Sequence, residues 1–240
     1  MDELTRYDLS ALAWYLLAWG MLGWLSDYAP NVRPSLSRLM NASRHRWMME
    51  MLRRDVRIVD TAILSSLQNG TAFFASTSLI ALGGTLALLN QSERVQLLFS
   101  DLPLHVAASK QLLEIKVLGL AVIYGYAFFK FGWAYRLFNY TAILVGAVPP
   151  PDHADEPETK KAANRAAAMQ IQAGSHFHWG LRSLFFSVGY LGWFLGPVVF
   201  CLTTTLIAAV LTHRQFWSRA RNALMDDEDA LASDDQGGAP

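Results

Sequence analysis

The 240-residue sequence has little charge, since Asp, Glu, Lys and Arg make up only 17% of it. A soluble globular domain carries about 25% charged residues, and here the deficit is concentrated in four long apolar runs. The formal net charge is zero, so no bulk electrostatic attraction to nucleic acid is predicted. The charge deficit argues against a soluble protein, and the 12% of aromatic residues excludes a disordered one.

Cysteine and catalytic signatures are also scarce. The single cysteine, Cys201, cannot form an internal disulfide and matches no metal-site spacing. The sequence contains no GxSxG, HExxH, P-loop or CxxC motif. None of the six histidines falls in the middle of an apolar run, which argues against a bis-histidine haem bundle. We therefore expect no enzyme activity and no cofactor.

The four apolar runs are long enough to cross a bilayer, which requires about 20 residues of helix. They predict membrane spans at about residues 9–26, 70–90, 115–135 and 183–212. The last run contains Gly196-Pro197, and a kink is predicted there because proline removes a backbone donor. The acidic start of the chain, without a small-x-small cleavage site, argues against a signal peptide.

The helical patterns next to the second and third runs continue beyond the length that a membrane needs. Helical segments at about 34–68 and 136–175 are therefore predicted outside the bilayer. Residues 216–240 are acidic and are predicted to form a disordered tail. The predicted fold is all-α, an integral-membrane four-helix bundle over residues 1–215 with long cytoplasmic helical extensions.

Lys and Arg are unevenly distributed over the connections between the runs. The first and third connections hold twelve of them, against seven in the N-terminus, the second connection and the C-terminal tail together. By the positive-inside rule, the first and third connections are cytoplasmic and both termini are periplasmic, in a bacterial inner membrane. Three residues of the C-terminal tail oppose this orientation: Arg214, Arg219 and Arg221.

Small and polar residues recur at seven-residue spacing, which is nearly two helical turns, so each set lines one face of a helix. The sets are Asn69, Ser76, Gly83 and Asn90 in the second run, and Gly125, Gly132, Asn139 and Gly146 in the third. The fourth run adds Gly192 and Gly196, which form a GxxxG pair, with Thr203, Thr204 and Thr205. Such faces pack helices within one subunit, pack subunits together, or line a narrow polar path at an oligomer axis.

Charged and histidine side chains next to the runs form a second group of candidates. The Arg-rich segment 33–57 predicts an amphipathic helix on anionic headgroups or a vestibule that attracts anions. Asp60 is predicted to pair with Arg57 or Arg182, as a structural pair first and a gate second. The cytoplasmic charged candidates are Asp60, Arg53, Arg54, Arg57 and Arg182.

His176 and His178 are the remaining candidates, for a metal site completed by His153, Asp152 and Asp155. Residues two apart on a helix point in different directions, so an interfacial role next to Trp179 is favoured and no metal is expected.

Two stretches resemble the bacterial and plant membrane family catalogued as domain of unknown function 599. One runs NGTAFFASTSL from Asn69 to Leu79, and the other is HFHWGLRSLFF from His176 to Phe186, followed by Trp193 and Phe194. The Arg46-Trp47-Met48 segment also fits, and the resemblance covers about residues 9–215. The chain departs from the family pattern at His178, where Asn is expected, and at Trp179, where a polar or basic residue is expected. The resemblance implies a multi-span membrane protein without an assigned activity.

Three hypotheses follow for the function. The first is a homo-oligomeric channel or transporter for small solutes, with anions favoured by the Arg-rich side. The second is a non-transporting scaffold or lipid-binding subunit that holds anionic lipid or a partner protein. The third and weakest is a membrane enzyme that uses His176 and His178. All three hypotheses place the protein in a lipid bilayer, and none of them involves nucleic acid.

Overall fold

The computed structural model describes residues 5–27, 34–89 and 109–225, and within these ranges it is helical and without strands. The main helices are α1 (Arg6–Asp27), α2 (Leu36–Met51), α3 (Ile58–Leu89), α5 (Lys110–Gly146), α6 (Pro157–Leu191) and α7 (Pro197–Phe216). Two 3₁₀ turns, η1 (Pro151–His153) and η2 (Gly192–Leu195), flank α6. Asn90 and most of the predicted tail lie outside the described residues.

Four helices are long and apolar enough to cross a membrane: α1, α3, α5 and the helical stretch that begins with α7. The first three correspond to the predicted spans at 9–26, 70–90 and 115–135. The predicted helical segments 34–68 and 136–175 are α2, the start of α3, the end of α5 and the first half of α6. The fold of the described residues is thus all-α, as predicted.

The structure corrects the prediction of one kinked span over 183–212. The long helix α6 ends at Leu191, and after η2 the chain reaches Gly196 with φ +123° and ψ 165°. That backbone region is open essentially to glycine. Pro197 then occupies the first turn of α7, where its missing N–H costs nothing. A reversal results, and Thr203 Oγ1 donates back to the carbonyl oxygen of Gly189 at 2.7 Å.

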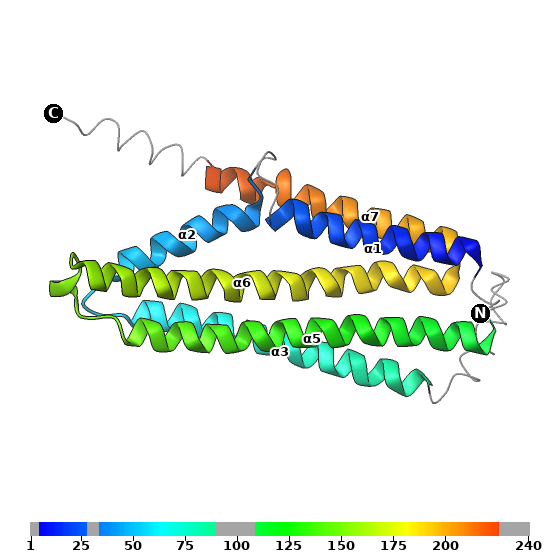
Figure 1. Ribbon diagram of the computed structural model, residues 1–240, viewed down its shortest axis with the longest axis horizontal. Helices are drawn as coiled ribbons and strands as arrows, with labels where there is room; N and C mark the ends of the chain where they lie inside the picture. Colours follow the sequence, from blue (N-terminus) through cyan, green and yellow to red (C-terminus); the bar gives the residue numbers. More distant parts are fainter. Residues whose placement is uncertain (1–4, 28–33, 90–108, 226–240) are drawn as a thin grey trace.

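Helices α1 and α7 run side by side in the same direction (Figure 1). At one end Trp193, just before α7, donates to the Asp8 carboxylate of α1 at 2.7 Å. Farther along, Trp14 Nε1 donates to Thr205 Oγ1 at 3.1 Å. The start of α1 and the end of α7 therefore lie at opposite ends of this pair.

Helix α6 extends along the length of the molecule and packs antiparallel on α5 (Figure 1). Small residues let the two helices approach closely. A Cβ atom added at Gly180 would lie 2.7 Å from the ring of Phe131, and one added at Gly119 would overlap the Tyr190 hydroxyl. Bulky side chains of each helix thus fill notches left by glycine on the other.

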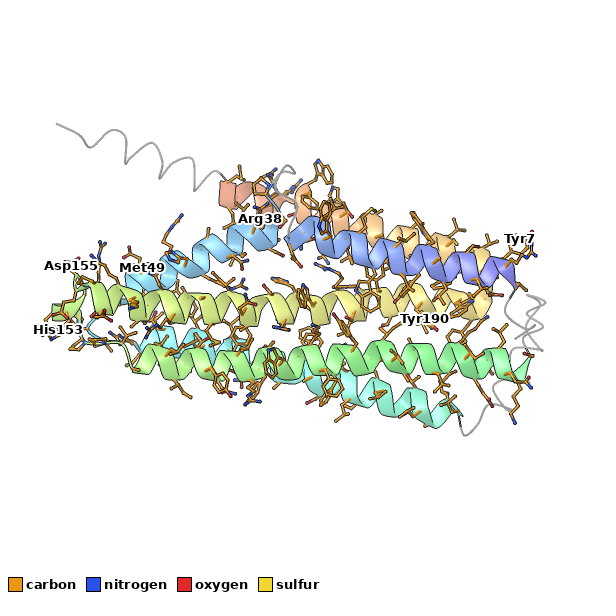
Figure 2. All side chains as sticks on the ribbon, viewed as in Figure 1. Tyr7, Arg38, Met49, His153, Asp155 and Tyr190 are labelled. Carbon is orange, nitrogen blue, oxygen red and sulfur yellow. The ribbon has the colours of Figure 1, made fainter. Side chains whose placement is uncertain are left out.

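The two larger of three hydrophobic cores in the described residues lie toward opposite ends of α6, and the smallest groups Ala134 and Phe138 with Ala173. Around α1 and α7 the core is aromatic, and the rings of Tyr15, Phe186, Tyr190, Trp193 and Phe200 pack edge-to-face or stacked. At the other end, α2 and the far parts of α3 and α5 pack on a small-residue face of α6, with Met48 and Met51 against Ala163 and Ala167. Figure 2 places Tyr7 at the first end and His153 and Asp155 at the second.

Gly196→Ala is predicted to destabilise the protein by about 1–3 kcal/mol, because an alanine strains the backbone in this region of φ and ψ. The measurement is thermal or denaturant unfolding of the purified protein in detergent. Gly20→Ala in α1 is the matched control, since nothing lies within 4 Å of its added Cβ. Equal effects of the two substitutions would contradict the reversal.

Candidate functional site

Two tryptophan–aspartate contacts mark the two ends of α1. Trp193 Nε1 donates to Asp8 Oδ1 at 2.7 Å, and Lys116 Nζ donates to the Trp193 carbonyl at 2.8 Å. Near the other end, Trp179 Nε1 donates to Asp27 Oδ2 at 2.7 Å, and Arg182 Nη1 lies 3.9 Å from the same oxygen. Each contact thus combines an indole, a carboxylate and a cation.

The Asp60 carboxylate is fully buried and pairs with residues other than those predicted. Its Oδ1 accepts from Arg54 Nη1 and from Trp47 Nε1, each at 2.6 Å, while its Oδ2 has no partner among the described residues. The prediction of Arg57 or Arg182 as its partner was wrong. The sequence distance to Arg54 is short, and the break between α2 and α3 folds that residue back over Asp60.

Arg57 instead closes the end of α5. Its guanidinium donates to the carbonyl oxygens of Val145, Val148 and Pro149, so it satisfies acceptors that the helix end leaves open. Arg53 lies on the surface and forms an exposed pair with Glu50 at 3.5 Å. Arg54 and Arg57 therefore hold parts of the extension together, and of the charged candidates Arg182 lines a cavity.

The seven-residue stripe of α3 faces away from the rest of the chain. Asn69, Ser76 and Gly83 are exposed, whereas Thr71 and Ser78 are buried on the opposite, α5-facing side. Of the residues in the apolar window of α3, only 11% are buried. Among the described residues this set therefore does not pack within the subunit, which was one of the three predicted uses of such stripes.

The stripe of α5 is divided between two environments. Gly132 and Gly146 are exposed, and nothing lies within 4 Å of a Cβ added at Gly125, Gly132 or Gly146. Asn139 is half-buried and accepts a hydrogen bond from Gln68 of α3 at 2.9 Å, so it ties the two helices together.

The fourth group does pack inside the subunit. Gly192 faces the Thr203 side chain, and Gly196 makes the chain reversal. Thr204 is fully buried with an unpaired hydroxyl, and Thr205 is exposed. Thr203 and Thr204 therefore belong to the contact between α6 and α7.

The structure does not bring His176 and His178 into one site. His176 packs against the rings of Trp133 and Trp179, whereas His178 lines a cavity with Arg182. His153 lies far away, where it donates to Glu156 at 2.7 Å. That hydrogen bond, with Asp152 nearby, raises the pKa of His153 above its ordinary value. Within the described ranges, no three His, Cys, Asp or Glu side chains are grouped to hold a metal.

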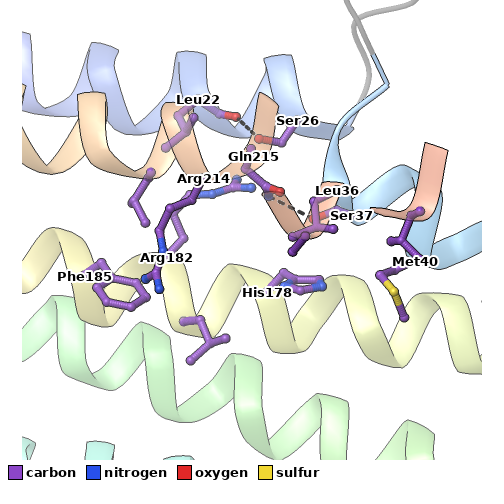
Figure 3. Close-up of a pocket in the computed structure, with 14 residues that line it drawn as sticks. Leu22, Ser26, Leu36, Ser37, Met40, His178, Arg182, Phe185, Arg214 and Gln215 are labelled. Carbon is purple, nitrogen blue, oxygen red and sulfur yellow. Dashed lines mark hydrogen bonds between the residues drawn. The ribbon is translucent and has the colours of Figure 1, made fainter. Parts of the chain in front are cut away.

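Two adjoining cavities lie where α1 and α7 end and α2 begins, and Figure 3 shows the residues that line the larger one. The larger, called the apolar cavity, has a volume of about 580 Å³ and is lined mainly by aliphatic side chains with Arg182 and Arg214. The smaller, called the polar cavity, has about 160 Å³ and includes Arg38 and Asn41. The two share Ser26, Ser37 and His178.

Comparison with known families decides the affiliation of the chain. The model of the family described as "Protein of unknown function, DUF599" matches residues 10–220. The chain belongs to the DUF599 family. No curated protein and no solved structure matches it. The family match confirms the resemblance identified from the Asn69 and His176 stretches, and it assigns no activity.

Sequence reasoning missed the charged residues at the ends of α1. Asp8 and Asp27 fall just outside the predicted first span, and Lys116 opens the third, so they were read as ordinary flanks. These residues could have been recognised as candidates because each is ionisable and lies at the edge of an apolar run, near tryptophans. In membrane proteins such residues usually form a specific pair with another side chain.

Asp60→Ala is predicted to cost about 2–3 kcal/mol of stability, because it leaves the Trp47 indole N–H and the Arg54 guanidinium without their acceptor. Asp60→Asn keeps one acceptor oxygen and should cost less. Glu50→Ala is the control: it breaks an exposed pair with Arg53 and should cost at most about 0.5 kcal/mol. Unfolding in detergent measures all three, and equal losses for Asp60→Ala and Glu50→Ala would refute the structural role of the buried pair.

Proposed function

We propose that this DUF599 protein is an integral protein of the bacterial inner membrane in which five segments cross the bilayer. The fifth is the second half of α6, from about residue 179. This segment packs against α1, α5 and α7, which are apolar enough to span a membrane. It would therefore lie in the membrane with them, although α6 as a whole is too polar to be a candidate span by itself. Asp8 and Asp27 are 19 residues apart on α1, or about 28 Å, which is close to a hydrocarbon core of about 30 Å.

Five crossings put the N-terminus and the end of α7 on opposite sides. The extension built from α2 and the first half of α6 lies on the side of the end of α7 (Figure 1). Most basic residues fall on that side, including Arg214, Arg219 and Arg221. The positive-inside rule makes it the cytoplasm. This orientation replaces the expectation of two periplasmic termini and accounts for the three tail arginines that opposed it.

The topology predicts opposite results for reporters at the two ends. A tag at the N-terminus should be labelled from the periplasm, and a reporter fused after the C-terminus should be active only in the cytoplasm. A reporter inserted at the exposed Asp155, in the loop between α5 and α6, is the internal control and should also report the cytoplasm. Termini found on the same side would refute the five-crossing arrangement.

We further propose that the protein is a homo-oligomeric channel or transporter for small solutes, with anions favoured. The observation that carries this proposal is the outward stripe of Asn69, Ser76 and Gly83 on an apolar helix. Ser76 and Gly83 lie within the predicted span 70–90, where a polar group facing lipid is costly and small residues let helices approach closely, and Asn69 lies at its edge. Subunits arranged around an axis with α3 inward would cover the stripe and line a narrow polar path with it.

The charges inside the subunit support placing the path between subunits. Asp60, Asp8 and Lys116 are buried and hold neighbouring side chains or carbonyls. Those contacts fix the helices in place rather than leave polar groups pointing into a common opening. The basic cytoplasmic side would raise the local concentration of anions near the axis.

Cross-linking and flux test this assembly together. In a Cys201→Ser background, Ser76→Cys should form disulfide-linked dimers in the membrane, whereas Leu202→Cys, exposed on α7, should not. Liposomes with the purified protein should pass chloride or acetate, and Asn69→Leu should lower the flux at least several-fold. Absence of cross-links at Ser76 would refute the interface, and cross-links without any flux would refute transport while leaving an oligomeric scaffold.

A further inference from the structure

The pair of cavities at the ends of α1 and α7 combines two kinds of surface. The walls of the apolar cavity come from α1, α2, α6, α7 and the helical residues 219–225 that follow α7. They include Leu22, Leu36 and Phe185, which Figure 3 labels, together with Leu181, Leu211 and Leu224. A cavity of about 580 Å³ lies within the range of roughly 300–1,000 Å³ typical of small-molecule sites. Its lining suits a hydrocarbon chain rather than a fully hydrated ion.

Cationic groups lie at the polar part of the same cavity. Arg182 is only 8% exposed, and Arg214 approaches from α7 (Figure 3). Among the described residues that line the apolar cavity, none is acidic. The Asp27 carboxylate in the adjoining cavity stands 3.9 Å from Arg182, and its oxygen already accepts from Trp179. Two guanidinium groups thus lie at the polar part of the apolar cavity with little negative charge near them.

A histidine joins the two cavities. His178 lines both, and its Nε2 is buried without a hydrogen-bond partner among the described residues. A buried polar atom without a partner costs free energy unless something binds it. The polar cavity beyond it offers Ser37, Asn41 and Ser175, which are uncharged hydrogen-bonding side chains suited to a polar headgroup.

We propose that these cavities form a binding site for an anionic amphiphile with one carboxylate or phosphate and at least one hydrocarbon chain. The anionic group binds Arg182, Arg214 and His178, and the chain lies in the apolar cavity between α1, α6 and α7. Arginine suits this task because its planar donors engage carboxylate or phosphate in pairs. The site lies at the level of Asp27 and Trp179, the cytoplasmic boundary of the bilayer in the proposed topology, where such a molecule would have its headgroup.

This site is independent of the channel proposal, since α3 does not contribute to either cavity. It also differs from attraction of lipids to a basic helix surface. Its distinguishing feature is that charge and chain are recognised together, so loss of either part should weaken binding.

Native mass spectrometry of the detergent-purified full chain tests the site with four probes: phosphatidylglycerol, phosphatidylcholine, oleate and inorganic phosphate. We expect retention of phosphatidylglycerol, oleate or both, at one molecule per chain, and at least tenfold weaker binding of phosphatidylcholine and phosphate. Phosphatidylglycerol alone would identify a phospholipid headgroup, and oleate alone a free fatty acid. Equal retention of phosphatidylcholine and phosphatidylglycerol, or of phosphate and either amphiphile, would overturn the proposal.

Paired variants separate the two parts of the site. Arg214→Gln should weaken binding of the retained amphiphile about tenfold, the effect of one charge-assisted hydrogen bond. Arg219→Gln, the same change at an exposed position that lines neither cavity, should have no effect. Leu181→Trp, which fills the apolar cavity, should also weaken binding, whereas Leu191→Trp at the exposed end of α6 should not.

Arg182→Gln is a further variant, with unfolding in detergent checked because the side chain is buried against Gly23. The decision rests on Arg214→Gln and Leu181→Trp, whose positions are less central to packing. If neither changes the retention of any amphiphile relative to its control, the site is refuted.

Discussion

The close contact of α5 and α6 is the interaction on which the other helices depend. Glycine notches at Gly119 and Gly180 let these two helices interlock through the rings of Tyr190 and Phe131, and the pair then extends through both larger cores. α3 packs on α5, α2 packs mainly on α6, and α7 packs on both α6 and α1. Because small residues set the spacing, bulk introduced there would displace elements at both ends of the molecule.

The sequence predicted the class of fold and three of the four helices that are long and apolar enough to cross a membrane, since length and hydropathy depend only on local composition. It missed the reversal at Gly196 because a glycine–proline pair indicates a break but not its direction. The choice between kink and reversal depends on the contact of Thr203 with Gly189, which is tertiary. For the same reason residues 183–191, the end of α6, were predicted to form one span with α7, since local hydropathy does not show where the chain turns back.

The candidate residues likewise divide into those that local sequence predicts and those whose role depends on tertiary packing. The α3 stripe was visible as a pattern, but which way it faces depends on where α5 packs, and that is a property of the whole bundle. Arg182 was selected for its charge and does line a cavity, while Arg54 and Arg57 hold parts of the extension together. Arg214 became a neighbour of Arg182 only through the reversal, which carries α7 back toward the start of α2. His178 precedes Arg182 by four residues on α6, so helix geometry alone places these two together.

The bond between Trp193 and Asp8 joins residues 185 positions apart. At roughly 5–20 residues per second, on the order of 10–40 s of synthesis separates the two partners. During that interval α1 is present without α7 or the aromatic cluster that covers Tyr15, and the Asp8 carboxylate lacks its indole donor. Helix α1 is therefore synthesised before the other described helices but is among the last of them to be fixed in place. During synthesis α1 must therefore persist without these contacts until Trp193 and α7 have been made.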